Sequence, residues 1–254
     1  MTAPESMPSM TLFGHLREMR RRLIASLIAL AIACLVTYHY ADQLLQFLTA
    51  PLREILPGQP LVFIGLQEPF LVKLKIALWG GAVLSSPWWL YQFWAFVGPG
   101  LYRAERRQAA FLAGAATALL LVGAAFAYFL VMPLSFRFFL DQGGALLAPM
   151  PAVNQYLSLS LTFILAFGLV FQMPLGLVFC GRLGLVDAPM LRRGRRYGVL
   201  IIFIVAAVLT PPDAISQCFL AAPMLLLYEL SIVLVGKGAA RAGEPSADEE
   251  RPVA

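Results

Sequence analysis

A cluster of arginines stands directly before an apolar stretch that is long enough to cross a membrane. Arg20, Arg21 and Arg22 end the cluster, and the apolar stretch runs from Leu23 to about Tyr40. A spanning helix needs about 20 apolar residues, and Lys and Arg gather in the loops that remain in the cytoplasm. The junction therefore predicts a membrane-spanning helix whose N-terminal end stays in the cytoplasm.

The composition agrees with a membrane protein and disfavours other classes. Of the 254 residues, 60% are hydrophobic and 13% are charged, which leaves too few polar groups to cover a soluble surface. The net charge of +5 would suggest a nucleic-acid partner in a soluble chain, but here the cations fall in loops, so we expect none. The three cysteines are odd in number and lie inside or at the ends of apolar segments, so we expect no disulfide framework. The two histidines are too far apart to suggest a metal site, and we expect no cofactor.

Six apolar segments are predicted to be the membrane helices. They span residues 23–40, 76–96, 109–133, 157–180, 197–209 and 214–235. The fifth would be only about 20 Å long as a helix, less than a hydrocarbon core of about 30 Å. Residues 210–213, which include two prolines, separate it from the sixth and predict a tight turn in a short helical hairpin. We therefore expect an all-α integral membrane protein with six transmembrane helices, the last two short.

The positions of Lys and Arg predict the orientation. Most of the 19 fall before the first segment, after the second, after the fourth or in the C-terminal tail. The exceptions are Arg53, Lys73, Lys75 and Arg137. Since cations favour the cytoplasmic side, both termini are predicted to be cytoplasmic. Residues 1–235 would form one six-helix transmembrane domain, and the small, charged stretch 236–254 would be a disordered cytoplasmic tail.

Motifs along almost the whole chain, from His15 to about Val235, resemble those of the TatC family, the multispanning receptors of twin-arginine protein translocases. The resemblance rests on the joint order and spacing of the motifs. They are His15 to Leu23, Pro51-Leu52, Glu68-Pro69-Phe70 with Lys75, Ser86-Pro87, Tyr91 to Phe96, Pro99 to Tyr102 with Glu105-Arg106-Arg107, Phe126 to Phe129, Phe167-Gly168 with Phe171 and Pro174, and Thr210 to Asp213 with Ser216-Gln217. The resemblance implies a protein of the bacterial cytoplasmic membrane that exports folded proteins with the proton-motive force.

Two carboxylates on the predicted cytoplasmic side, Glu18 and Glu105, are the candidate recognition residues. Guanidinium groups are bound best by carboxylates in bidentate geometry. The resemblance implies that the acidic residues at these positions recognise the two arginines of a signal peptide, and it adds Arg20 and Phe96 to the expected signal-peptide-binding site. A purely structural interpretation stays open, because Glu18 precedes Arg22 by the spacing of a helical ion pair and Glu105 adjoins further arginines.

Three polar residues at membrane depth are further candidates, since such residues are functional by default. Gln172 stands where the family pattern usually has a glutamate, so a role that needs ionisation is not supported there, while a polar role survives. Asp213 is expected to cap the N-terminus of the sixth helix. Glu229, within the sixth segment, requires a hydrogen-bonding partner or a water-lined face.

The resemblance also implies partners. They are the twin-arginine signal peptides of folded precursor proteins, single-span subunits of the TatA and TatB type, further copies of the chain in a receptor complex, and the lipid bilayer. No enzymatic activity is expected. A secondary transporter of small solutes is the alternative, although it would not require paired cytoplasmic carboxylates. An intramembrane protease is disfavoured, because His39, the one histidine near the membrane, lies at a helix end and no Gly-x-Ser context is present.

Overall fold

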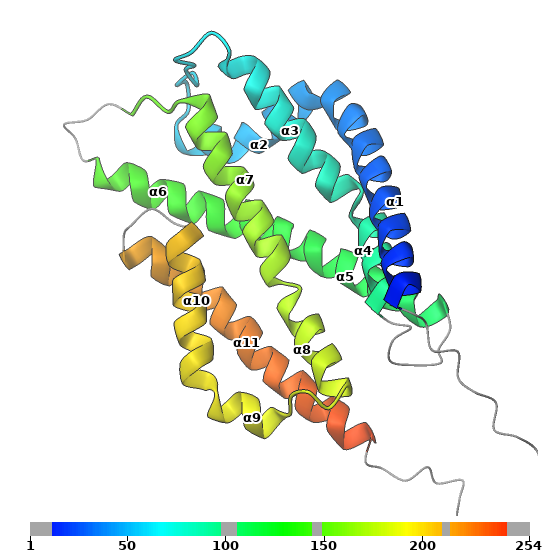
Figure 1. Cartoon of the computed structure of the whole chain (residues 1–254). Coiled ribbons are helices and arrows are strands. Elements are labelled where there is room, and N and C mark those ends of the chain that lie inside the picture. Colours follow the sequence, from blue (N-terminus) through cyan, green and yellow to red (C-terminus); the bar gives the residue numbers. More distant parts are fainter. Residues whose placement is uncertain (1–11, 98–105, 144–148, 210–213, 243–254) are drawn as a thin grey trace, which may run out of the picture. The chain divides into compact units, whose positions relative to one another are not determined.

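The computed structural model describes residues 12–97, 106–143, 149–209 and 214–242, and these ranges are almost entirely helical. Figure 1 shows the helices in chain order. They are α1 (Leu12–His39), α2 (Ala41–Ile55), α3 (Glu68–Leu84), α4 (Ser86–Val97), α5 (Arg106–Phe126), the π-helical turn η2 (Ala127–Val131), α6 (Met132–Gln142), α7 (Val153–Val170), α8 (Met173–Arg182), α9 (Ala188–Arg193), α10 (Arg195–Leu209) and α11 (Ala214–Ala242). Within these ranges the β-structure is limited to one isolated bridge, between Val62 and Ala152.

Several of these helical stretches are long and apolar enough to cross a membrane. The described residues contain four such stretches: Leu16–His39, Ala109–Gln142, Val153–Arg182 and Leu220–Lys237. Helices α3 and α4 qualify as a fifth if they form one span, although they are bent by 52° at Ser85. The predicted all-α membrane class is therefore confirmed, and the predicted six apolar segments are all helical.

The prediction that the last two helices are short is right for α10 and wrong for α11. Helix α10 has 15 residues, which is short for a span, as expected. Helix α11 has 29 residues and is one of the longest in the chain. It continues past the apolar run through residues 236–242, where alanine, lysine and arginine favour a helix and no proline ends it, although Gly236 and Gly238 are poor helix formers. The boundary expected at residue 236 thus lies inside α11, and 243–254 lie outside the described residues.

The contacts divide the chain into two compact units. The first comprises residues 1–44 and 73–117, and the second comprises 45–72 and 118–254. In the first unit, α1 packs against α4 and approaches α3 closely. A Cβ atom on Gly81 would lie 2.6 Å from Cys34 Sγ and 2.9 Å from Cys34 N, so only glycine fits there. The buried Thr37 hydroxyl also donates a 2.7 Å hydrogen bond to the Ala77 carbonyl oxygen. Close approach at a glycine and a hydroxyl hydrogen bond between helices are both typical of membrane helix packing.

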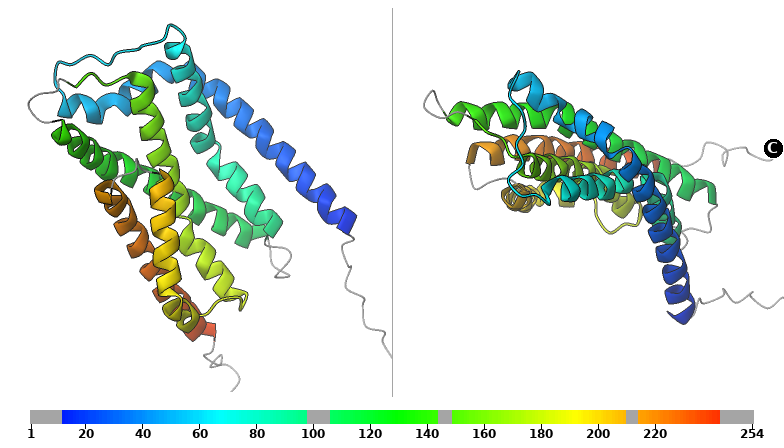
Figure 2. Two further views of the ribbon diagram at one scale, coloured as in Figure 1. Left: turned by 60° about the vertical axis from the view of Figure 1, so that its left-hand side comes forward. Right: turned by 90° about the horizontal axis from the view of Figure 1, so that it is seen from above.

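In the second unit, α11 packs along α8 and also contacts α9 and α10 (Figure 2). Small residues again allow the close approach, because a Cβ atom on Gly198 would lie 2.8 Å from the Tyr228 ring. The Tyr228 hydroxyl donates a 2.9 Å hydrogen bond to the Leu191 carbonyl oxygen. Helices α9, α10 and α11 are therefore tied together by one tyrosine, which fits the predicted hairpin of α10 and α11.

Two tyrosines of the second unit donate hydrogen bonds to backbone carbonyl oxygens in the middle of α2. The Tyr128 hydroxyl donates to the Phe47 carbonyl oxygen and the Tyr156 hydroxyl to the Leu48 carbonyl oxygen, each at 2.7 Å. The Phe47 carbonyl needs a side-chain donor because the residue four positions later is Pro51, which has no N–H. Tyr128 lies in the π-helical turn η2 and stacks on the Phe47 ring at a centroid distance of 4.4 Å.

Candidate functional site

The carboxylate of Glu18 is held by Arg22, one turn later on α1. Arg22 Nε and Nη2 donate to the same oxygen, Glu18 Oε1, at 3.0 Å and 2.6 Å. The side chains of Arg22 and Glu18 are 24% and 28% exposed, so the pair is neither fully solvated nor fully buried. The ion pair that the spacing predicted is therefore present, and the second carboxylate oxygen, Oε2, remains an acceptor that these two bonds do not use.

Arg22 also connects α1 to α4. Its Nη1 donates to Gln92 Oε1 at 3.2 Å, a contact between residues 70 positions apart in the sequence. This contact was not predicted, since nothing in the local pattern around Gln92 indicates which helix it faces. Arg22 thus has two acceptors, a carboxylate on its own helix and an amide on the neighbouring one, and a rotation of its side chain can favour either.

The other predicted members of this site stand near the same ends of α1 and α4. Arg20 is exposed on α1, and Phe96 is half-buried one turn after Gln92 on α4. Helices α1 and α4 contact each other in the first unit, and the Arg22–Gln92 hydrogen bond lies at this contact. Glu105 lies outside the described residues and immediately precedes α5, whose first half belongs to the same unit.

Gln172 lies at a break between α7 and α8. Its backbone N–H donates to the Leu169 carbonyl oxygen at 2.9 Å, and its own carbonyl accepts from the Gly176 N–H at 2.9 Å. Pro174 follows in the first turn of α8 and cannot donate a backbone hydrogen bond, which explains the break. The half-buried Gln172 side chain therefore stands at an interruption of an apolar span.

Glu229 has the polar partner that its position required. Arg195 Nη2 lies 2.8 Å from Glu229 Oε2, and the two side chains are 53% and 49% exposed. Arg195 is the first residue of α10, so Glu229 on α11 lies level with the beginning of that helix rather than with its middle. Asp213, the expected cap of the sixth helix, lies outside the described residues.

A second ion pair in the first unit was not predicted. Lys73 donates to Asp42 at 2.9 Å and so joins the beginnings of α2 and α3. Among the described residues, no three His, Cys, Asp or Glu side chains gather as a metal site would require.

Comparisons with known proteins give one consistent result. The model of the family described as Sec-independent protein translocase protein (TatC) matches residues 14–223. The Sec-independent protein translocase protein TatC of Carboxydothermus hydrogenoformans is 41% identical over 226 residues, which cover 89% of this chain and 92% of that protein. The protein of the same name from Aquifex aeolicus is 38% identical over 234 residues, covering 91% and 97%.

A solved structure agrees with the sequence relatives. A crystal structure described as the twin-arginine translocase receptor TatC superposes with a TM-score of 0.80 at 37% identity, and the match covers 89% of this chain and 99% of that one. The family match, the relatives and the shared fold each cover most of the chain. The chain therefore belongs to the TatC family of Sec-independent protein translocase proteins.

Proposed function

We propose that this chain is the signal-peptide receptor of a twin-arginine translocation system, with Glu18 and Glu105 as the carboxylates that bind the two arginines. The observation that carries the proposal is the Glu18 carboxylate, which a guanidinium already binds and whose second oxygen those bonds leave unused. A site that holds one guanidinium in a charge-assisted pair has the chemistry to hold another.

Arg22 would act as an internal substitute for the arginine of the signal peptide. When that arginine arrives, Arg22 can keep its bond to Gln92 on α4 while the incoming guanidinium takes over Glu18. Such an exchange replaces one ion pair with another, so its net free energy is small, in keeping with the about 0–1 kcal/mol that partly exposed pairs contribute. The arginines would therefore select the peptide, and apolar contacts near Phe96 would supply most of the affinity.

The remaining assignments follow from this role. The chain would act in the bacterial cytoplasmic membrane with both termini cytoplasmic, as one six-helix domain over residues 1–235. It would export folded precursors with the proton-motive force, together with TatA- and TatB-type subunits and further copies of itself, and it would catalyse no chemical reaction. Gln172, Asp213 and Glu229 would be the polar residues that matter within the membrane. The comparisons do not favour the small-solute transporter.

Export and binding assays on carboxylate variants test the proposal. Replacing Glu18 and Glu105 together with alanine should abolish binding and export of a twin-arginine precursor, while Sec-dependent export continues. Glu54→Ala is the matched control, because Glu54 is an exposed carboxylate on α2 outside this site. Normal precursor binding by a double variant that is present in the membrane at wild-type abundance would refute the assigned site.

A further inference from the structure

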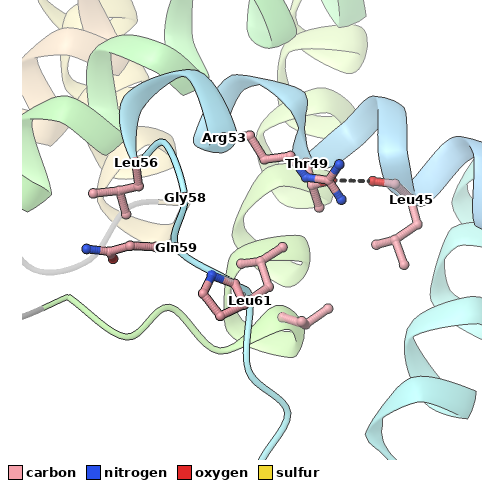
Figure 3. A pocket seen from close by; sticks show the side chains of 9 residues that line it. Leu45, Thr49, Arg53, Leu56, Gly58, Gln59 and Leu61 are labelled. Atoms are coloured by element: carbon pink, nitrogen blue, oxygen red, sulfur yellow. Dashed lines mark hydrogen bonds between the residues drawn. The ribbon is translucent and has the colours of Figure 1, made fainter.

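A pocket of about 660 Å³ opens between α2 and the segment that follows it, independently of the proposed signal-peptide site. Its walls are mainly apolar, and Figure 3 shows the side chains that line it. Those used below are Leu45, Thr49, Arg53, Leu56, Leu61 and Val153. The volume falls within the range of about 300–1,000 Å³ that is typical of ligand sites.

Arg53 is the one charged residue of the lining. Its guanidinium lies along the α2 wall beside Thr49 and Leu45 in Figure 3. Among the described residues Arg53 makes no salt bridge, and its neighbour Glu54 does not line the pocket. The Thr49 hydroxyl is already bonded to the Leu45 carbonyl oxygen at 2.9 Å, so it does not compete for Arg53. The pocket thus pairs an apolar wall with one available cation.

The place of this cation in the sequence is also unusual. Arg53 and Arg137 are the two arginines that fall outside the predicted cytoplasmic regions. Of these two, only Arg53 lines the pocket. Helix α2 follows a membrane-spanning stretch and is amphipathic, with Leu48 and Leu52 buried and Asp42, Arg53 and Glu54 exposed. Such a helix suits the interface between hydrocarbon and water.

The backbone around the pocket argues against a peptide strand as the occupant. Val62 N–H donates to the Pro151 carbonyl oxygen at 3.2 Å, and Val153 N–H donates to the Val62 carbonyl oxygen at 2.9 Å. Gln59 N–H is bonded to the Leu56 carbonyl oxygen at 3.4 Å. Because these groups already have partners, they are not available as a free edge for an added strand.

We propose that this pocket binds an anionic phospholipid of the outer leaflet, with Arg53 on the headgroup phosphate and an acyl chain along Leu45, Leu56, Leu61 and Val153. A guanidinium matches a phosphate in bidentate geometry, and the apolar wall suits a hydrocarbon chain. The bound lipid would stabilise α2 and the segment after it against the beginning of α7.

Native mass spectrometry of the purified chain in mild detergent tests this inference. The chain is titrated with phosphatidylglycerol and, separately, with phosphatidylcholine of the same acyl chains, and bound lipid is counted. The wild type should prefer phosphatidylglycerol, and Arg53→Gln should weaken that binding about fivefold. Arg137→Gln, which removes an exposed arginine on α6 outside the pocket, should bind like the wild type.

A second variant separates the apolar part of the site from the charge. Leu61→Trp fills the pocket without changing the charge, and it should reduce the binding of both lipids while the unfolding temperature stays close to that of the wild type. Equal binding of both lipids by the wild type, or unchanged phosphatidylglycerol binding by Arg53→Gln, would overturn the inference. Crosslinking of a protein partner from position 59 that phosphatidylglycerol does not reduce would also overturn it.

Discussion

Replacing Tyr128 with phenylalanine removes one hydroxyl and leaves in place the ring that stacks on Phe47. In the wild type this hydroxyl donates a 2.7 Å hydrogen bond to the Phe47 carbonyl oxygen. The helical donor that would otherwise serve that carbonyl is missing, because position 51 is proline. The bond is partly buried, so its loss should cost part of the about 1–3 kcal/mol that a fully buried, unpartnered acceptor costs, and Tyr128→Phe should destabilise the protein by about 1–2 kcal/mol.

Tyr156→Phe is the matched comparison. Its hydroxyl donates at the same 2.7 Å to the Leu48 carbonyl oxygen, but the residue four positions after Leu48 is Leu52, which has an N–H. Tyr156→Phe should therefore lower the free energy of unfolding by less than Tyr128→Phe does, by about 0.5–1.5 kcal/mol, which is the net value of an ordinary hydrogen bond. For a chain of this size, 1 kcal/mol shifts the unfolding temperature by about 2–4 °C, so thermal unfolding in mild detergent resolves the two variants.

The cause can be isolated by restoring the missing donor. Pro51→Ala supplies an N–H to the Phe47 carbonyl oxygen, so Tyr128→Phe should cost less in a Pro51→Ala background than in the wild type. The cost of Tyr156→Phe should be the same in both backgrounds. If Tyr128→Phe costs the same with and without Pro51, the proline is not the reason that Tyr128 matters, and the explanation given for α2 is wrong.

Three further predictions concern packing, the membrane break and topology. Gly81→Leu should destabilise the protein at the upper end of the about 1–3 kcal/mol that overpacking costs. Gly114→Leu should be tolerated in the same unfolding assay, because a Cβ atom on Gly114 would meet no other part of the described structure within 4 Å. Gln172→Glu should preserve export and Gln172→Leu should impair it at equal membrane abundance; normal export by the leucine variant would show that the polar group is dispensable. Reporter fusions after Gly184 should be cytoplasmic and those after Gly58 exported, and the reverse pattern would contradict the orientation.

The sequence was most informative where the relevant interaction is local. The arginine cluster before Leu23 and the apolar runs predicted the membrane-protein class and the helical segments, because hydropathy is a property of consecutive residues. The Glu18–Arg22 pair was predictable for the same reason, since one helical turn fixes its geometry. The amphipathic helix α2 was not among the predicted segments, because these were assigned from continuous apolar runs and α2 alternates buried and exposed residues.

Interactions between distant parts of the chain were not predictable. Gln92 meets Arg22 only because α1 and α4 pack together, and the Lys73–Asp42 pair likewise depends on which helices are neighbours. The breaks at Ser85 and Gln172 depend on how a proline-containing turn is accommodated, which a hydropathy pattern does not indicate. The length of α11 was underestimated because the apolar pattern ends before the helix does.

Site-directed photocrosslinking tests the central claim most directly. A photoreactive amino acid at position 21 lies on the exposed surface of α1, one helical turn from Glu18, and one at position 96 lies one turn from Gln92 on α4. Both positions should crosslink to a precursor whose signal peptide carries two arginines, and neither should crosslink to the same precursor with two lysines or when Glu18 and Glu105 are alanine. Equal crosslinking of the two precursors, or crosslinking that persists without both carboxylates, would contradict the proposed recognition of the arginines.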